Sequence, residues 1–208
     1  MQSIRYRLIE FFVIFVLVPT SFALEFNIWI KMAIGCLGFV YVVYVLLKVE
    51  NNKFKIRQHI NWKQFWMRTA IKLFSISMLT AIYMYIFDVE NLFVVIKNKP
   101  MFWALILFIY TIFSVYPQEL IYRTFFFQRY ESLFRNDALF ILVNAALFSL
   151  AHLFFKNTLV MVLTFIGGIL FALTFKKTKS TLLVSIEHAI YGCWLFTVGM
   201  GEMLGFPS

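Results

Sequence analysis

The chain has 208 residues, of which 62% are hydrophobic and only 14% are charged, with a net charge of +9. A soluble domain is about 45–50% apolar and about 25% charged, so this composition excludes a soluble globular protein. The positive charge does not indicate nucleic-acid binding, because the basic residues gather in short loops between apolar runs, as they do in membrane proteins. We predict one integral membrane domain over residues 1–208, of the all-α class: a polytopic transmembrane helix bundle with seven or eight spans.

The apolar runs are long enough to cross a membrane, which takes about 20 residues in a helix. Arg5 and Arg7 precede the first run, which we interpret as an uncleaved first span. Its Glu10 is expected to snorkel toward the cytoplasmic interface. The predicted spans are residues 8–24, 29–47, 68–87, 101–116, 138–155, 159–175 and 181–200.

The segment 101–134 is too long for one straight span, since 34 helical residues extend about 50 Å and a hydrocarbon core is about 30 Å thick. Pro117 is expected to kink or restart the helix there. Residues 118–134 then form a helix of their own. If that helix crosses the membrane alone, it makes an eighth span and reverses the orientation of everything after it.

Basic loops at 48–63, 123–135 and 176–179 fall on one side of a seven-span arrangement. The positive-inside rule then predicts a cytoplasmic amino terminus in the cell membrane. His59, in the first of these loops, is interpreted as a surface histidine. Gly167 and Gly168, in the sixth predicted span, favour close helix packing.

Four ionisable residues fall where hydrocarbon is expected: Glu119, Arg123, His152 and His188. An ionisable group at the centre of a membrane helix costs about 2.5–3.5 kcal/mol on insertion scales, so such groups usually face a protein interior and mark a functional site. Glu119 and Arg123 are four residues apart and share a helix face. Taken singly, the pair could be an internal ion pair and each histidine a hydrogen-bonded core residue. Their convergence from three helices favours a site.

Two chemistries fit these residue types. In the first, a desolvated carboxylate acts as general base on water, the histidines stabilise the oxyanion, and no cofactor is expected. In the second, a glutamate and two histidines form a three-ligand zinc site with an open position for water. The sequence leaves both open.

The order of these motifs resembles the CPBP family of intramembrane proteases, which includes the CAAX prenyl endopeptidases and proteins of bacteriocin self-immunity. The motifs are Glu-x-x-x-Arg at Glu119 and Arg123, Phe-x-x-x-His at Phe148 and His152, and the third histidine at His188. The match covers roughly residues 101–200, the motif-bearing core. The resemblance implies an α-helical protease that hydrolyses a peptide bond with a glutamate-activated water. Carried over onto this sequence, Glu119 matches the second glutamate of the family's first motif and Arg123 its arginine, while the usual water activator is the glutamate before it. We predict that Glu119 takes over as the base with Arg123 as its orienting partner, and that His152 and His188 position water and stabilise the oxyanion.

Two positions depart from the family pattern. Gln118 stands where the family has its first glutamate, and Gly192 stands where an oxyanion-binding asparagine is expected. Asn144, on the face of His152, is a candidate replacement for that amide. The departures keep a second reading open, in which a catalytically degenerate membrane binding, immunity or maturation factor retains the pocket without cleaving. A proton-coupled transporter is less favoured, since no inverted repeat is evident.

The expected partners follow from these readings. They are a peptide or protein substrate, lipidated or membrane-embedded, together with membrane lipids, and no nucleic acid is expected.

Overall fold

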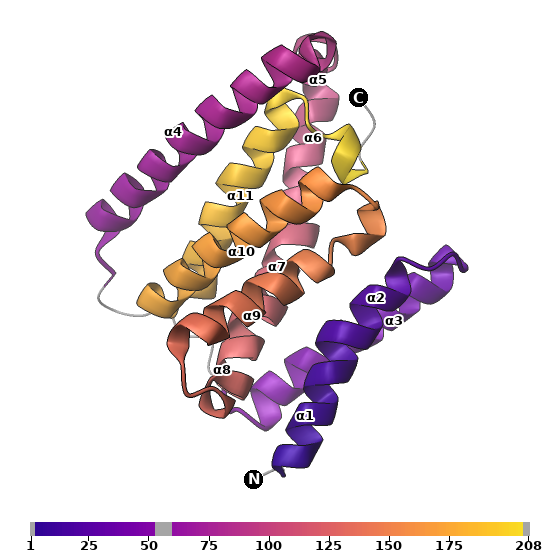
Figure 1. The fold of residues 1–208 in the computed structure, drawn as a ribbon, viewed down its shortest axis with the longest axis vertical. Helices are drawn as coiled ribbons and strands as arrows, with labels where there is room; N and C mark the ends of the chain where they lie inside the picture. Colours follow the sequence, from indigo (N-terminus) through magenta and orange to yellow (C-terminus); the bar gives the residue numbers. More distant parts are fainter. Residues whose placement is uncertain (1–2, 53–59, 206–208) are drawn as a thin grey trace. The chain divides into compact units, whose positions relative to one another are not determined.

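The computed structural model describes residues 3–52 and 60–205, and these residues form helices and turns without a β-strand (Figure 1). The prediction of an all-α polytopic bundle is confirmed. His59 and residues 53–59 of the predicted basic loop lie outside the described residues.

Six helices in the described part of the chain are long and apolar enough to cross a membrane, and the chain is an integral membrane protein. They are α3 (Ile28–Lys48), α4 (Trp62–Phe87), the long helix Pro100–Leu133, the helix Asp137–Phe155, α10 (Thr158–Thr178) and α11 (Thr181–Val198). Five of them correspond to predicted spans. The largest difference is at α4, which begins at Trp62, six residues before the predicted start at residue 68.

Polar side chains set the beginnings of these helices. A capping side chain accepts a hydrogen bond from one of the first backbone N–H groups, which have no partner inside the helix. Asparagines do this for four spans and a serine for the fifth: Asn27 for α3, Asn61 for α4, Asn136 for α9 (Asp137–Leu150), Asn157 for α10 and Ser180 for α11.

The first predicted span is a continuous helix formed by α1 (Ile4–Phe12), a π-helical turn (Val13–Leu17) and α2 (Val18–Phe22). It is not among the six candidate spans. The prediction that Glu10 snorkels is wrong, because its side chain is buried. Charged and phenolic donors inside the protein replace the water that snorkelling would have supplied.

The expectation that the helix restarts at Pro117 is also wrong. Residues 100–133 are helical without interruption, through α6 (Pro100–Ile109), a π-helical segment (Tyr110–Val115), α7 (Tyr116–Glu119), a second π-helical segment (Leu120–Phe125) and α8 (Phe126–Tyr130). A proline lacks an N–H and crowds the carbonyl four residues earlier. The π-helical turn before Pro117 changes the hydrogen-bonding pattern at that point, so the proline is accommodated without ending the helix.

The chain divides into two units, and the first contains residues 1–55 and 118–179. Its most extensive helix pair is α9 and α10, which lie side by side (Figure 1). Gly168 makes this possible, since a Cβ there would lie 2.9 Å from the Cα of Ala145. Close packing at Gly168 was predicted and is confirmed. An aromatic core built from α1 and the 122–140 region fills the unit: Phe11, Phe15, Tyr122, Phe125, Phe126, Tyr130 and Phe140.

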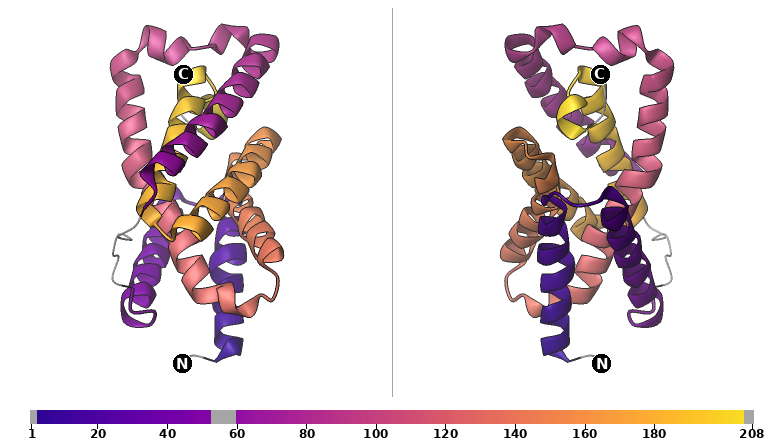
Figure 2. Two further views of the ribbon diagram at one scale, coloured as in Figure 1. Left: turned by 90° about the vertical axis from the view of Figure 1, so that its left-hand side faces the viewer. Right: turned by 90° about the vertical axis from the view of Figure 1, so that its right-hand side faces the viewer.

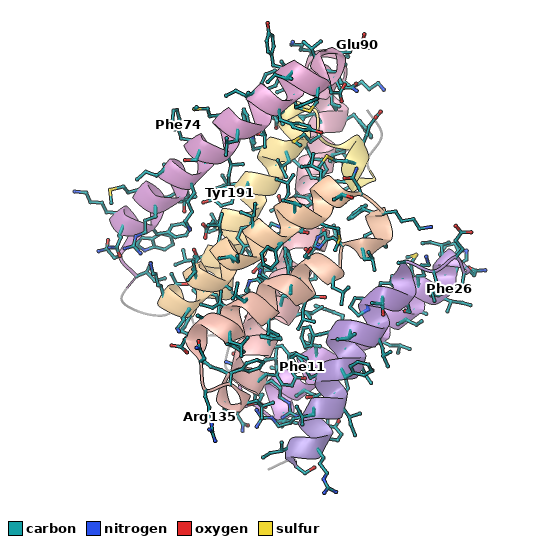
Figure 3. All side chains as sticks on the ribbon, in the orientation of Figure 1. Phe11, Phe26, Phe74, Glu90, Arg135 and Tyr191 are labelled. Carbon is teal, nitrogen blue, oxygen red and sulfur yellow. The ribbon has the colours of Figure 1, made fainter. Side chains whose placement is uncertain are left out.

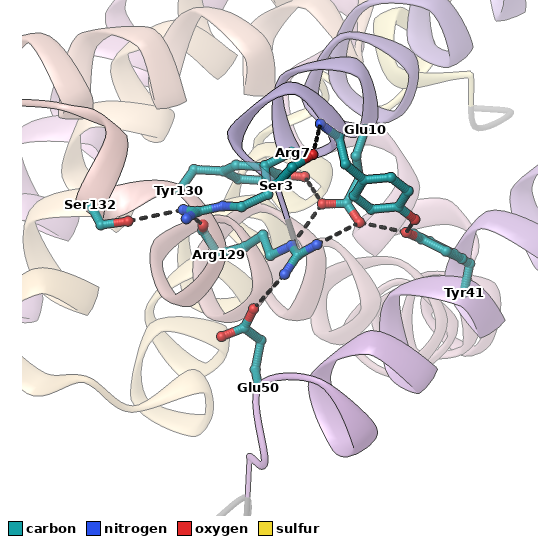
Figure 4. Close-up of polar contacts among 9 residues, drawn as sticks. Ser3, Arg7, Glu10, Tyr41, Glu50, Arg129, Tyr130 and Ser132 are labelled. Carbon is teal, nitrogen blue, oxygen red and sulfur yellow. Dashed lines mark hydrogen bonds and ion pairs between the residues drawn. The ribbon is translucent and has the colours of Figure 1, made fainter. Parts of the chain in front are cut away.

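A buried ionic cluster joins α1, α3 and α8 in this unit (Figure 4). Arg129 Nε donates to Glu10 Oε2 at 2.7 Å, and its Nη1 donates to Glu50 Oε1 at 2.9 Å. The hydroxyls of Tyr41 and Tyr130 also donate to Glu10. Arg7 donates to the Arg129 carbonyl and to Ser132. We call these residues the Glu10 cluster: Arg7, Glu10, Tyr41, Glu50, Arg129, Tyr130 and Ser132.

The second unit contains residues 56–117 and 180–208. Within it α11 packs against α4 and against α6, and α5 (Val94–Asn98) precedes α6 (Figure 2). Trp194 of α11 donates to Thr80 of α4, and Trp103 of α6 donates to Thr197 of α11. Tyr191 lies on the side of α11 that faces α4, whereas Phe74 projects from the outer side of α4 (Figure 3).

Candidate functional site

Glu119 and Arg123 form the ion pair that their spacing predicted. Arg123 Nε lies 3.3 Å from Glu119 Oε2, and both side chains are fully buried in the first unit. They sit at the junction of α7 and the π-helical segment Leu120–Phe125. Single π-helical turns inside α-helices occur frequently at functional sites. This junction therefore carries two charges at a depth where either one alone would be costly.

Asn144 of α9 fixes the guanidinium from a second helix. Arg123 Nη1 donates to Asn144 Oδ1 at 2.8 Å, and Asn144 Nδ2 donates to the Tyr122 carbonyl at 2.7 Å. That carbonyl also accepts from Arg123 Nη1 at 3.2 Å. The amide thus holds Arg123 by one end and the backbone beside it by the other. Asn144 therefore supports Arg123. The sequence had suggested it only as a replacement for the oxyanion-binding amide.

The ring of Phe148 covers the guanidinium. The Arg123 Cζ lies 4.8 Å from the centroid of Phe148 and 5.8 Å from that of Phe171. A guanidinium stacked over an aromatic face gains a cation–π interaction, which is stronger where water is excluded. The orientation of Arg123 is therefore determined on several sides, and with it the position of the carboxylate that it pairs with.

His152 lies in the turn between α9, which ends at Leu150, and the 3₁₀ turn Leu153–Phe155, inside the candidate span Asp137–Phe155. Its Nδ1 lies 2.7 Å from the Phe148 carbonyl, and its ring packs 4.8 Å from the Phe148 ring centroid. A carbonyl can only accept a hydrogen bond, so Nδ1 carries the proton. In the neutral ring the lone pair is then on Nε2.

The first unit thus brings three of the four predicted residues into one chain of contacts. We call it the Glu119 network: Glu119, Arg123, Asn144, Phe148 and His152. The Phe148 ring links its two ends, since it lies over Arg123 on one side and beside His152 on the other.

His188, the fourth predicted residue, belongs to the second unit. It lies on α11, is 6% exposed, and its ring packs edge-to-face against Tyr110, with the centroids 6.1 Å apart. The side chain of the preceding residue, Glu187, contacts different residues from those that His188 contacts. Glu187 Oε1 accepts from Lys72 Nζ at 2.6 Å and from the Tyr191 hydroxyl at 2.9 Å. Glu187 therefore docks α4 onto α11, a role that its position beside His188 did not reveal.

The predicted zinc alternative needs a glutamate and two histidines together. Within each unit, the described residues hold no group of three His, Cys, Asp or Glu side chains suited to a metal ion. In the Glu119 network the metal-binding residue types are one histidine, His152, and one carboxylate, Glu119, which pairs with a guanidinium. The zinc alternative stays a prediction.

Comparison with known proteins supports the family resemblance. Residues 100–194 match the family model described as type II CAAX prenyl endopeptidase Rce1-like. The matched segment includes all four predicted site residues, and the predicted resemblance to the CPBP and CAAX proteases is confirmed over it. No curated protein and no solved structure matches the chain.

Proposed function

We propose that this chain, whose residues 100–194 match the type II CAAX prenyl endopeptidase Rce1-like model, is an intramembrane endopeptidase that hydrolyses a peptide bond with a water activated by Glu119. One observation carries the proposal: a fully buried carboxylate is held by a guanidinium that a second helix fixes in turn. Buried charges are expensive, and such fixed arrangements are typical of reacting groups.

The proposed reaction assigns each proton and bond. Glu119 takes a proton from water while the water oxygen bonds to the peptide carbonyl carbon, which forms a tetrahedral oxyanion. When the oxyanion collapses, the C–N bond breaks, and Glu119 returns the proton to the departing amine nitrogen. The products are a new carboxylate and a new amine, and no oxidant or reductant is required.

The other residues of the site orient these groups. Arg123 and Asn144 are positioning residues that set the angle of the Glu119 carboxylate. His152, with its proton on Nδ1, accepts a hydrogen bond from the attacking water through Nε2. His188 is assigned to the oxyanion on the basis of its sequence motif, and a fixed donor there would stabilise the charge that develops in the transition state.

A second candidate function is a membrane binding, immunity or maturation factor that grips a peptide without cleaving it. It is favoured by Gln118, since an amide cannot act as a general base, and by the ion pair itself. A buried arginine–carboxylate pair can also be purely structural, since each charge neutralises the other inside the protein. Both functions use the same site and differ in turnover alone.

The deciding experiment compares purified wild type with Glu119→Gln on a farnesylated Cys-a-a-X peptide and on its unprenylated counterpart. We expect wild type to release the terminal tripeptide and Glu119→Gln to lose this activity while remaining folded and membrane-inserted. Glu131→Gln is the matched control, because Glu131 pairs with Lys179 in a partly exposed position. Turnover retained by Glu119→Gln would refute its role as the base. Peptide binding by wild type without cleavage would establish the second candidate.

The substrate class and cofactor requirement are tested in the same assay. We propose a peptide or protein substrate presented at the membrane, and the pair of peptides reports whether the prenyl group is recognised. A comparison of membrane peptidomes from cells expressing wild type or Glu119→Gln identifies natural substrates. Activity that is lost with a chelator and restored by zinc would support the three-ligand zinc alternative, while activity that persists would support the glutamate mechanism alone.

We also propose that the amino terminus is cytoplasmic, in the cell membrane. In the first unit, several basic helix ends lie at the same end as Arg7: Arg129 contacts Arg7 and Glu50, and Lys179 pairs with Glu131. Positive charges gather on the cytoplasmic side. Labelling of a single cysteine at Ser3 in sealed vesicles, in a background without Cys36 and Cys193, tests this orientation.

A further inference from the structure

The first helix of the chain lies outside the segment matched by the family model, yet it packs against the segment that carries Arg123. Phe15 of this helix is fully buried. Its ring packs edge-to-face against Tyr122, with the centroids 5.4 Å apart, and lies 6.2 Å from the Phe125 ring. Both partners belong to the π-helical segment Leu120–Phe125 of the same unit. A side chain of the first helix therefore supports the part of the chain that holds the proposed site.

Tyr122 connects Phe15 to Arg123 in two ways. The Tyr122 ring packs edge-to-face against Phe148, with the centroids 5.4 Å apart, and the Phe148 ring covers the guanidinium. The Tyr122 carbonyl accepts from Arg123 Nη1 and from Asn144 Nδ2. A shift of Tyr122 would therefore change both the ring and the hydrogen bonds that orient the guanidinium.

The π-helical segment changes which donors the Tyr122 carbonyl meets. In an α-helix this carbonyl would accept from the N–H four residues later, which is that of Phe126. Here the Phe126 N–H donates to the Ile121 and Arg123 carbonyls instead. π-Helical turns are rare and depend on the side chains that pack around them. Phe15 packs on this turn, so its ring stabilises the backbone conformation that directs the Tyr122 carbonyl toward the guanidinium.

We propose that Phe15 is a positioning residue for the Arg123 guanidinium and acts through Tyr122. The ring of Phe15 holds Tyr122 in the place where its carbonyl meets Arg123. Arg123 in turn orients the carboxylate of Glu119. This inference rests on the proposed peptidase function, because the angle of that carboxylate affects turnover only if Glu119 is the base. It makes the first helix part of the working enzyme, although the family match does not include it.

The first test is Phe15→Leu, which removes the ring and keeps an apolar side chain. A displacement of about 1 Å at a reacting group can lower the rate by about 10²-fold, so we expect kcat per folded molecule to fall by about tenfold or more, with KM close to that of wild type. Phe11→Leu is the matched control, because the Phe11 ring packs on Phe126 and Tyr130 one turn earlier. It should lower the thermal midpoint and leave kcat per folded molecule unchanged. Equal kcat in the two variants would overturn the proposal.

A double-variant cycle tests the route through Tyr122 without relying on turnover. Asn144→Ala removes the amide that donates to the Tyr122 carbonyl. Changes within one network of contacts have non-additive effects on stability, whereas independent changes add. The double variant Phe15→Leu, Asn144→Ala should therefore lose less unfolding free energy than the two single variants lose in sum. The double variant Phe11→Leu, Asn144→Ala should lose the sum, and additivity in both cycles would contradict the route through Tyr122.

The outcomes separate this inference from the function on which it rests. An inactive Glu119→Gln together with equal kcat in Phe15→Leu and Phe11→Leu would remove the role of Phe15 and leave the peptidase intact. A fully active Glu119→Gln would refute the proposed base, and the stability cycle alone would then decide whether Phe15 positions Arg123.

Discussion

The first unit contains two buried arginine–glutamate pairs that differ in how they are held. In the Glu10 cluster, Arg129 divides its hydrogen bonds between two carboxylates, and Glu10 also accepts from two tyrosine hydroxyls. In the Glu119 network, Arg123 divides its contacts between one carboxylate, an amide and a backbone carbonyl. The first arrangement surrounds a carboxylate with donors, while the second supports a guanidinium.

This difference distinguishes the Glu10 cluster, which joins helices, from the Glu119 network, which is the candidate reactive site. The two oxygens of Glu10 accept from Arg129 and from two phenolic donors on other helical segments, so Glu10 is suited to joining helices. The Arg123–Glu119 pair is longer, at 3.3 Å against 2.7 Å for Arg129 and Glu10. Its rigidity comes from Asn144 and Phe148, which touch the arginine. The comparison predicts that changes in the Glu119 network affect turnover and that changes in the Glu10 cluster affect stability.

The largest expected effect is on turnover in Glu119→Gln, set against Glu10→Gln. General-base catalysis contributes about 10²–10⁴-fold, so Glu119→Gln should lower kcat by about 10³-fold or more. Glutamine has the size of glutamate and keeps an oxygen beside Arg123, so the protein should remain folded. Glu10→Gln should do the reverse and keep kcat per folded molecule while lowering the thermal midpoint in detergent. Equal losses of turnover in both variants would remove the distinction between the two pairs.

Arg129→Leu is expected to have the largest effect on stability. It leaves Glu10 and Glu50 without their shared cation, and removal of one partner of a buried ion pair costs about 3–5 kcal/mol. Unfolding in detergent monitored by circular dichroism measures this change, with Lys156→Ala as the control, because the Lys156–Glu25 pair is exposed and should contribute less than about 1 kcal/mol. A loss of unfolding free energy below about 1 kcal/mol in Arg129→Leu would show that the Glu10 cluster does not stabilise the fold.

Asn144→Ala should affect both properties, with a smaller effect on each. A hydrogen bond to a charged group contributes about 1.5–3 kcal/mol, and this variant removes the one to Arg123. We also expect kcat to fall by about tenfold, because Arg123 loses the contact that sets its angle against Glu119. Asn144→Ala made in the Glu119→Gln background should cost the same stability and no further turnover. An independent loss of turnover in the double variant would mean that Asn144 acts directly on substrate.

The sequence was sufficient to predict five of the six candidate spans, because hydropathy and length decide which segments enter a membrane. It was also sufficient to single out the Glu119–Arg123 pair, since a spacing of four residues is local information. The close packing of α9 on α10 was predicted from Gly168 for a similar reason, because small residues in membrane helices mark contacts.

The predictions that failed depend on partners far away in the chain. Glu10 was expected to snorkel, and its burial depends on Arg129, 119 residues later. Asn144 was correctly placed near the site, but its contact with Arg123 depends on the rotation of α9, which no local pattern determines. The restart at Pro117 failed because a π-helical turn absorbs the proline, and a π-helical turn has no clear signal in the sequence.

The smallest expected effect comes from Tyr41→Phe, which probes how fully Glu10 is surrounded. The Tyr41 hydroxyl donates to Glu10, and its removal leaves the donors from Arg129 and Tyr130 in place. The expected loss is about 1 kcal/mol of unfolding free energy, with kcat per folded molecule unchanged. Tyr44→Phe, at an exposed position on the same helix, is the matched control. If Tyr41→Phe costs as much as Arg129→Leu, the donors around Glu10 act as one cooperative unit, whereas a small loss shows that Arg129 and Tyr130 together suffice to hold α1 to α8.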